Sequence, residues 1–300
     1  MASLTAATAG MASLSVSSGA DNGGTAANGG EGLVFTAEER AAFAAVEAAL
    51  LGTDNGRGNG LAPGDVRPRE VAVITMVSKG RVEKSVEKYK QFVTTLGEYG
   101  LTVSSLYEDR ATLHAKLAHK WKVSYQVCGA DSGGRSIMWI GSSEPTQVAE
   151  EQTVVHCGIL YWMAVHSDLR TLREGCTFVI DTSKQDSIGK VGNERKLQKT
   201  WQALPLRPQN LFIVGASFLK RLFINALIKF ASVFSNSKVL ARIQFVEMPE
   251  VRKVVSEENM PHELGGQQRS SVEEYVMARL QVWEGFEVGE AKSQDVEISL

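Results

Sequence analysis

Five short apolar runs with the composition of β-strands constrain the fold of this chain more than any other feature. Helical patterns separate them, because apolar residues recur at three- and four-residue spacing over residues 147–167 and again over 218–234. Short apolar strands that alternate with helices are typical of an α/β fold. The sequence therefore predicts strands at Ser124–Cys128, Ile137–Ile140, Thr177–Ile180, Leu211–Val214 and Val239–Val246.

The beginning of the chain differs in composition from the rest. Residues 1–32 are rich in Ala, Ser, Thr and Gly and carry too little apolar bulk to offset the entropy lost on ordering, so we expect them to be disordered. We expect a helical N-lobe with the lead-in to the sheet at residues 33–128. A second lobe with a C-terminal helix is expected at 129–284, followed by a polar tail at 285–300.

Helix signals support this organisation. Thr36 and Glu39 have the spacing of a capping box, and the helical pattern of residues 71–99 is interrupted at Lys79-Gly80, which predicts two helices joined by a turn. The residues expected on buried faces are Phe43, Val46 and Leu50 in the first helix, Val82, Val86, Tyr89 and Val93 in the helix after the turn, and Val272, Val276, Leu280 and Trp283 in a final helix that begins with a Ser271–Glu274 capping signal.

Composition argues against several functional classes. The net charge of −2 gives no overall electrostatic attraction to nucleic acid. The three cysteines, Cys128, Cys157 and Cys176, lie in apolar or strand-like contexts and are expected to be buried reduced thiols rather than a disulfide framework or metal ligands. The N-terminus lacks a secretory pattern and no apolar run is long enough to span a bilayer, so we expect a cytoplasmic protein.

No sequence signal of an enzyme stands out. A nucleophile elbow, a His-Glu-x-x-His pair and a Walker loop are missing from the sequence, and His156 and His166 fall on an apolar helix as core or rim residues. We therefore expect a protein that is not an enzyme, with no catalytic residues, no metal and no cofactor other than a bound ligand.

The most informative motif is the run from Lys238 to Gly266. It leads from Lys238 into a β-branched segment, passes through a short polar helix and closes on Met-Pro-His-Glu-Leu-Gly-Gly. An Asp-x-x-Gly-Arg turn at Asp131–Arg135 and a Thr-Phe-Val-Ile-Asp strand precede it. In this order the motifs resemble the CRAL-TRIO lipid-binding domain, the family of the phosphatidylinositol transfer proteins, over roughly Val71 to Gly266. The resemblance implies a helical N-lobe and a mixed β-sheet whose helices form a hydrophobic lipid pocket.

The resemblance also implies binding residues. In phosphatidylinositol-binding members a lysine that opens the last strand contacts the phosphate and a hydroxyl lies three residues earlier. The corresponding residues suggest a headgroup site formed by Lys238, Ser235, Asp131, Lys79 and Thr177. Asp131 has an alternative role of equal weight, which is to hold the turn that presents Gly133 and Gly134.

Residues 218–234 correspond to the gating helix of the family. Periodicity alone favours an ordinary core helix here, whereas the resemblance implies a lid that closes over the lipid and opens at a membrane. The residues expected in the lipid pocket and gating helix are Leu219, Leu222, Phe223, Ala226, Leu227, Phe230, Phe212 and Val214.

Departures from the family pattern affect ligand choice. The family's Tyr-Pro-Glu-Arg motif reads Leu204-Pro205-Leu206-Arg207 here, so the acidic hydrogen-bond acceptor for inositol hydroxyls is replaced by Leu206. Val127 and Met138 occupy the positions where aromatic rings would hold a choline group. The resemblance therefore implies binding, and transfer between membranes, of one lipid, with phosphatidylinositol or a related phospholipid favoured. A membrane-targeting or protein-interaction module in signalling or vesicle trafficking, and a carrier of a tocopherol, retinoid or sterol-like molecule, remain alternatives. Expected partners are the lipid and a transient membrane surface.

Overall fold

The computed structural model describes most of the chain after its N-terminal segment. Residues from Gly32 to Leu300 belong to one compact unit. The segment predicted to be disordered and the whole predicted gating helix, residues 218–234, lie outside the described residues. The described ranges are 33–52, 60–107, 110–118, 123–142, 151–183, 204, 206–215 and 242–293.

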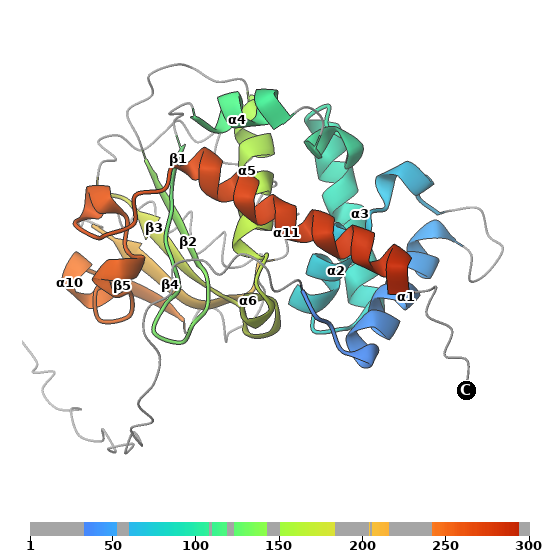
Figure 1. The fold of residues 1–300 in the computed structure, drawn as a ribbon, viewed down its shortest axis with the longest axis horizontal. Helices are drawn as coiled ribbons and strands as arrows, with labels where there is room; N and C mark the ends of the chain where they lie inside the picture. Colours follow the sequence, from blue (N-terminus) through green and yellow to red (C-terminus); the bar gives the residue numbers. More distant parts are fainter. Residues whose placement is uncertain are drawn as a thin grey trace, which may run out of the picture. The chain divides into compact units, whose positions relative to one another are not determined.

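Helices make up the N-terminal part of this unit (Figure 1). The predicted capping box is confirmed, because Thr36 Oγ1 accepts from Glu39 N and Glu39 Oε2 accepts from Thr36 N. The predicted break at Lys79-Gly80 is also confirmed: both residues adopt left-handed backbone, with φ of 63° and 68°, and so end the helix. The helices are α1 (Ala37–Leu51), α2 (Pro68–Val77), α3 (Val82–Glu98) and α4 (Arg110–Ala118), with short 3₁₀ turns at Pro63–Asp65 and Ser104–Tyr107.

The predicted apolar side of α3 faces the core. Tyr89 is fully buried, and the valines Val82, Val86 and Val93 are partly buried and pack against the core. The prediction omitted Phe92 and Leu96, which are also fully buried and whose larger side chains bury more apolar area than the valines.

A mixed five-stranded sheet confirms the α/β fold. Its strand order is β1-β2-β3-β4-β5; β1 is antiparallel to β2, and all other neighbours are parallel. The strands are β1 (Val123–Gln126), β2 (Ile137–Ser142), β3 (Cys176–Asp181), β4 (Pro208–Val214) and β5 (Ile243–Val246).

The β2–β3 connection carries two helices. The helix α5 (Glu151–Val165) is buried over its whole length from Val155, as expected for a helix packed between a sheet and other helices. The sequence patterns did not predict α6 (Leu169–Glu174), which is too short to show periodicity. It begins where Asp168 accepts hydrogen bonds from the backbone amides of Arg170 and Thr171.

The C-terminal part follows β5 as a short helix α10 (Met248–Val251), two 3₁₀ turns at Glu257–Asn259 and His262–Leu264, and the long helix α11 (Val272–Ser293). Figure 1 shows α11 crossing the molecule, in contact with α5, α4 and α2. The predicted cap at Ser271 and Glu274 is present, and Trp283 is fully buried, donating from Nε1 to the carbonyl of Met163. The helix continues to Ser293, into the segment predicted as a polar tail.

An ion pair links the first helix to the β2–β3 connection. Arg173 on α6 donates through two nitrogens to the two carboxylate oxygens of Glu39, both at 2.8 Å, and also to the carbonyl of Val34. Hydrogen bonding to Arg173 lowers the pKa of Glu39. The carboxylate that caps α1 therefore also attaches α1 to α6.

Candidate functional site

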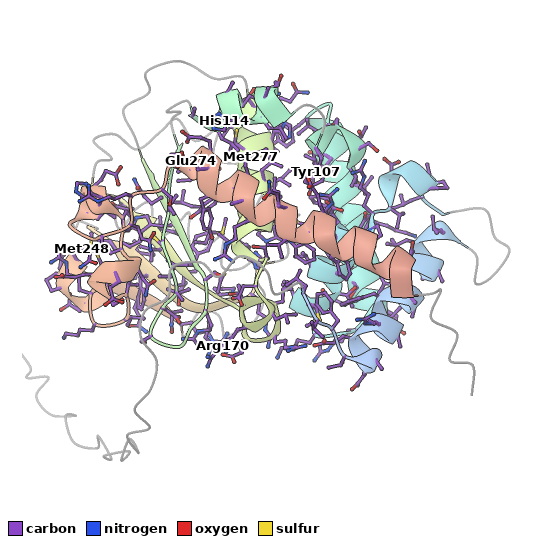
Figure 2. All side chains as sticks on the ribbon, in the orientation of Figure 1. Tyr107, His114, Arg170, Met248, Glu274 and Met277 are labelled. Carbon is purple, nitrogen blue, oxygen red and sulfur yellow. The ribbon has the colours of Figure 1, made fainter. Side chains whose placement is uncertain are left out.

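The two faces of the sheet differ in how they are covered. One face packs against the C-terminal segment of residues 248–260, which Met248 marks in Figure 2. Its apolar side chains on β2, β3 and β4 are at most 4 % exposed, whereas Gln244 on the edge strand β5 is exposed. We call this face of the sheet the closed face. Its members among the described residues are Cys128, Ile137, Trp139, Val179, Phe212 and Val214, packed with Val251, Val255 and Met260.

The other face, which packs against α5, carries one apolar side chain from each of the five strands. Strand register places these side chains side by side, and we call them the apolar row: Tyr125, Ile140, Ile180, Ile213 and Phe245. The row is not evenly covered. Ile213 is 1 % exposed, Ile140 and Ile180 are half-buried, and Phe245 on the edge strand is 51 % exposed. A second row behind it consists of Met138, Phe178, Leu211 and Ile243.

Phe212 and Val214, which were predicted to line the lipid pocket, lie on the closed face. Their neighbours Leu211 and Ile213 face α5. Because all four residues of this run are apolar, period-two alternation gave no signal of which pair faces which layer.

The structure brings Asp131 and Thr177 together. Asp131 Oδ1 accepts from the amides of Gly133 and Arg135, and Oδ2 accepts from the Arg135 side chain and, at 2.6 Å, from the Thr177 hydroxyl. Asn210 donates in turn to Thr177. This network joins the turn before β2 to β3 and β4, as expected of a residue that holds the turn.

Asp131 is ionised in this network although it is only 4 % exposed. Burial raises its pKa, but hydrogen bonds from Thr177 and Arg135 and the charge of Arg135 outweigh burial, so the net pKa lies below the usual value. A carboxylate offers about four acceptor positions, and these contacts fill them. The polar groups of Asp131 and Thr177 that were predicted to contact a headgroup are therefore used for hydrogen bonds within the fold.

The remaining predicted headgroup residues are not brought into this network by any contact of the described residues. Lys79 is exposed at the turn between α2 and α3. Ser235 and Lys238 lie outside the described residues, as do six predicted gating residues: Leu219, Leu222, Phe223, Ala226, Leu227 and Phe230.

Sequence reasoning missed two arginines at the amino-terminal ends of β4 and β5. Arg207 and Arg242 are both half-buried, and Arg242 Nη1 donates to the carbonyl of Pro208 at 2.9 Å. Burial, and then the nearby charge of Arg242, lower the pKa of Arg207. Within the described part of the chain, no hydrogen bond or ion pair involves the Arg207 guanidinium. The signal was present in the sequence, because Arg207 keeps the arginine of the motif whose glutamate is replaced by Leu206.

The predicted roles of the histidines and cysteines agree with their environments. His156 and His166 are buried and bond to the carbonyls of Leu106 and Trp162, and burial lowers the pKa of both, to about 4 for His166. The three cysteines are buried, and none of them forms a disulfide. Burial raises the pKa of Cys176 to about 12, which keeps its thiol protonated.

A pocket of about 280 Å³ lies apart from the apolar row, between the loop after α3, α4 and the start of α5. Its walls include Leu101, Leu113, Lys116, Gln152 and His156. Across the described ranges, no three His, Cys, Asp or Glu side chains are grouped as metal ligands would be. None of the helices found in those ranges is both long enough and apolar enough to cross a bilayer.

Comparison with known sequences agrees with this architecture. No curated protein matches the chain significantly. The family model of the CRAL/TRIO domain matches residues 120–266, which contain the sheet, α5, α6 and the segment that covers the closed face. CRAL/TRIO domains bind lipophilic ligands. Residues 120–266 therefore form a CRAL/TRIO domain.

Proposed function

We propose that the chain binds a single lipid whose apolar part lies along the apolar row, between the sheet and the α5 side of the molecule. The observation that carries this proposal is the contrast between the two faces. Trp139, Val179 and Phe212 on the closed face are packed by the C-terminal segment, whereas Ile140 and Ile180 of the apolar row are half-buried and Phe245 is 51 % exposed. Apolar side chains presented in a row offer a surface that a hydrocarbon chain can cover.

The size of this surface suits an acyl chain. Five strands at a spacing of about 4.8 Å give a row roughly 19 Å long. Each methylene removed from water contributes about 0.8 kcal/mol, so a chain of this length would dissociate into water very slowly. Release at a membrane surface is therefore the expected route, and we propose that the protein associates transiently with membranes and transfers its lipid there.

The headgroup class is inferred from charge. Arg207 and Arg242 place two cations at the amino-terminal edge of the parallel strands, and Arg207 is half-buried beside a like charge. An anionic group between them would relieve this repulsion, and guanidinium groups bind phosphate through charge-assisted hydrogen bonds. We therefore favour an anionic phospholipid such as phosphatidylinositol, with Lys238 as a further predicted contact. Since Leu206 cannot accept hydrogen bonds from inositol hydroxyls, we expect recognition of the phosphate more than of the inositol ring.

No bond is made or broken in this proposal: the protein holds and releases its ligand. Native mass spectrometry of the purified protein, followed by solvent extraction, tests it. One phospholipid bound per chain, with an anionic headgroup, is the expected result. A protein that is empty and takes up neither phosphatidylinositol nor phosphatidylcholine from vesicles would contradict lipid binding and favour an interaction module. A bound neutral lipid would contradict the headgroup assignment only.

A further inference from the structure

The half-buried Tyr125 differs from the two fully buried tyrosines, Tyr89 and Tyr161, in what its hydroxyl contacts. Tyr89 donates to the carbonyl of Asp65, and Tyr161 donates to the carbonyl of Gln126 and accepts from the amide of Trp139. Across the described ranges, no hydrogen bond involves the hydroxyl of Tyr125, although its backbone is paired in β1. The Tyr125 hydroxyl is not one of the fully buried polar atoms that lack a partner, so it is open to water or to a ligand.

Packing fixes the Tyr125 ring in place. It stacks on Tyr161 of α5 with ring centroids 4.6 Å apart and an interplanar angle of 33°. A Cβ atom on Gly158 would lie 2.8 Å from the Tyr125 hydroxyl oxygen, so the absence of a side chain at Gly158 makes room for this hydroxyl beside α5. Burial raises the pKa of Tyr125, so the phenol stays neutral and keeps its proton to donate.

The Tyr125 side chain belongs to the apolar row, which is the surface proposed to hold the lipid. Tyr125 is the β1 member of the apolar row, paired with Ile140. Arg207 and Arg242 precede β4 and β5, on the other side of the five-stranded sheet. Three to four strand spacings of about 4.8 Å separate the two positions across the sheet, and Arg207 and Arg242 also lie six and three residues before the apolar row along their strands. The total separation is therefore roughly 20–25 Å. A ligand whose anionic end is held by the arginines would therefore reach Tyr125 with a distant part of its chain.

We infer that Tyr125 is a specificity-determining residue that donates a hydrogen bond to an oxygen carried within the lipid's apolar chain, such as a hydroxyl or oxo substituent. This inference rests on the function proposed above and specifies the class of lipid: an oxygenated chain in place of a plain hydrocarbon. The surrounding side chains of the row, Ile140 and Ile180, are apolar, so Tyr125 is the hydrogen-bonding group of the row.

The test compares the wild-type chain with Tyr125→Phe, which keeps the ring and removes only the hydroxyl. The probes are octadecanoate and a series of its mid-chain hydroxy and oxo derivatives, measured by displacement of a fluorescent fatty acid. We expect the wild-type protein to bind at least one oxo derivative about tenfold more tightly than octadecanoate, since one hydrogen bond to a buried donor is then gained. Tyr125→Phe should bind both with equal affinity.

Stability provides a second readout. Tyr125→Phe removes an unpaired hydroxyl and should leave Tm unchanged or slightly higher, whereas Tyr161→Phe loses two hydrogen bonds and should lower it. The inference is overturned if the wild type shows no preference along the series, or if Tyr125→Phe keeps the preference. Failure of the proposed function looks different, because the wild-type protein would then bind neither octadecanoate nor any derivative.

Discussion

Ile213 and Phe245 are register partners on β4 and β5, yet the first is 1 % exposed and the second 51 % exposed. The two side chains lie next to each other on the same face of the sheet, and coverage of that face ends abruptly between β4 and the edge strand β5. A large apolar side chain left half in water contributes little to folding, so its apolar area is available to a ligand.

Substitution of Phe245 tests this surface. Phe245→Asp should weaken lipid binding at least about tenfold, because full burial of a phenyl ring by ligand contributes about 1.5–3 kcal/mol. Tm should change little, since the side chain is already exposed. Gln244→Asp on the same strand, exposed on the opposite side, introduces the same charge and serves as the control. Equal effects of both variants on binding would contradict the assignment of the face.

Arg207 tests the headgroup proposal. Arg207→Gln should reduce affinity for phosphatidylinositol about tenfold and leave phosphatidylcholine binding nearly unchanged, because it removes a charge-assisted contact to an anion. Vesicle uptake with each lipid measures the ratio. The exposed Arg269 offers a matched control, since Arg269→Gln removes the same charge elsewhere on the surface. A loss shared by both lipids would instead indicate damage to the domain.

The gating helix remains a prediction from sequence. Leu227→Asp or Phe223→Asp should abolish intermembrane transfer of a fluorescent lipid while leaving a folded protein, because a charge on a lid's apolar face opposes its contact with lipid. Asn225→Asp adds the same charge at a polar position of the predicted helix and should transfer normally. Undiminished transfer by Leu227→Asp and Phe223→Asp together would rule out the lid role.

The lowered pKa of the buried His166 predicts that the stability of the protein depends on pH. Its pKa is lowered by burial to about 4, against about 6.5 in an unfolded chain. Between these pH values the unfolded state binds a proton that the folded state excludes. The contribution of neutral His166 to the free energy of unfolding is therefore complete above about pH 6.5. It is lost as the pH falls toward 4, by up to about 3 kcal/mol. His166→Asn can retain the bond to the Trp162 carbonyl without titrating, and urea unfolding should then show a shallower decline over this window. His156, whose pKa is also lowered, accounts for part of the remaining slope; an unchanged profile would contradict the assignment to His166.

Much of the architecture could be predicted from local signals. The caps at Thr36 and Ser271 and the break at Lys79-Gly80 depend only on neighbouring residues, so sequence patterns identify them. Faces were harder to assign. In β4 every residue from Leu211 to Val214 is apolar, because parallel strands are covered on both sides, and only the three-dimensional neighbours distinguish Phe212 from Ile213.

The candidate site was predicted less completely for a related reason. Asp131 and Thr177 are 46 residues apart, and their hydrogen bond satisfies groups that sequence motifs alone assigned to a ligand. In the sequence, Arg207 is distinguished only by its place in the altered motif, beside Leu206. Its importance follows from burial next to Arg242, which is a property of the sheet edge that only the folded chain creates.

The carboxylate of Glu39 makes two contacts at once: it closes the cap of α1, and it binds Arg173 on α6. Local helix formation at the start of the compact unit is thereby coupled to long-range docking across 134 residues of sequence. The amide hydrogens of α1 and α6 should consequently exchange with solvent as one cooperative unit, and loss of either partner would expose both helices to opening together.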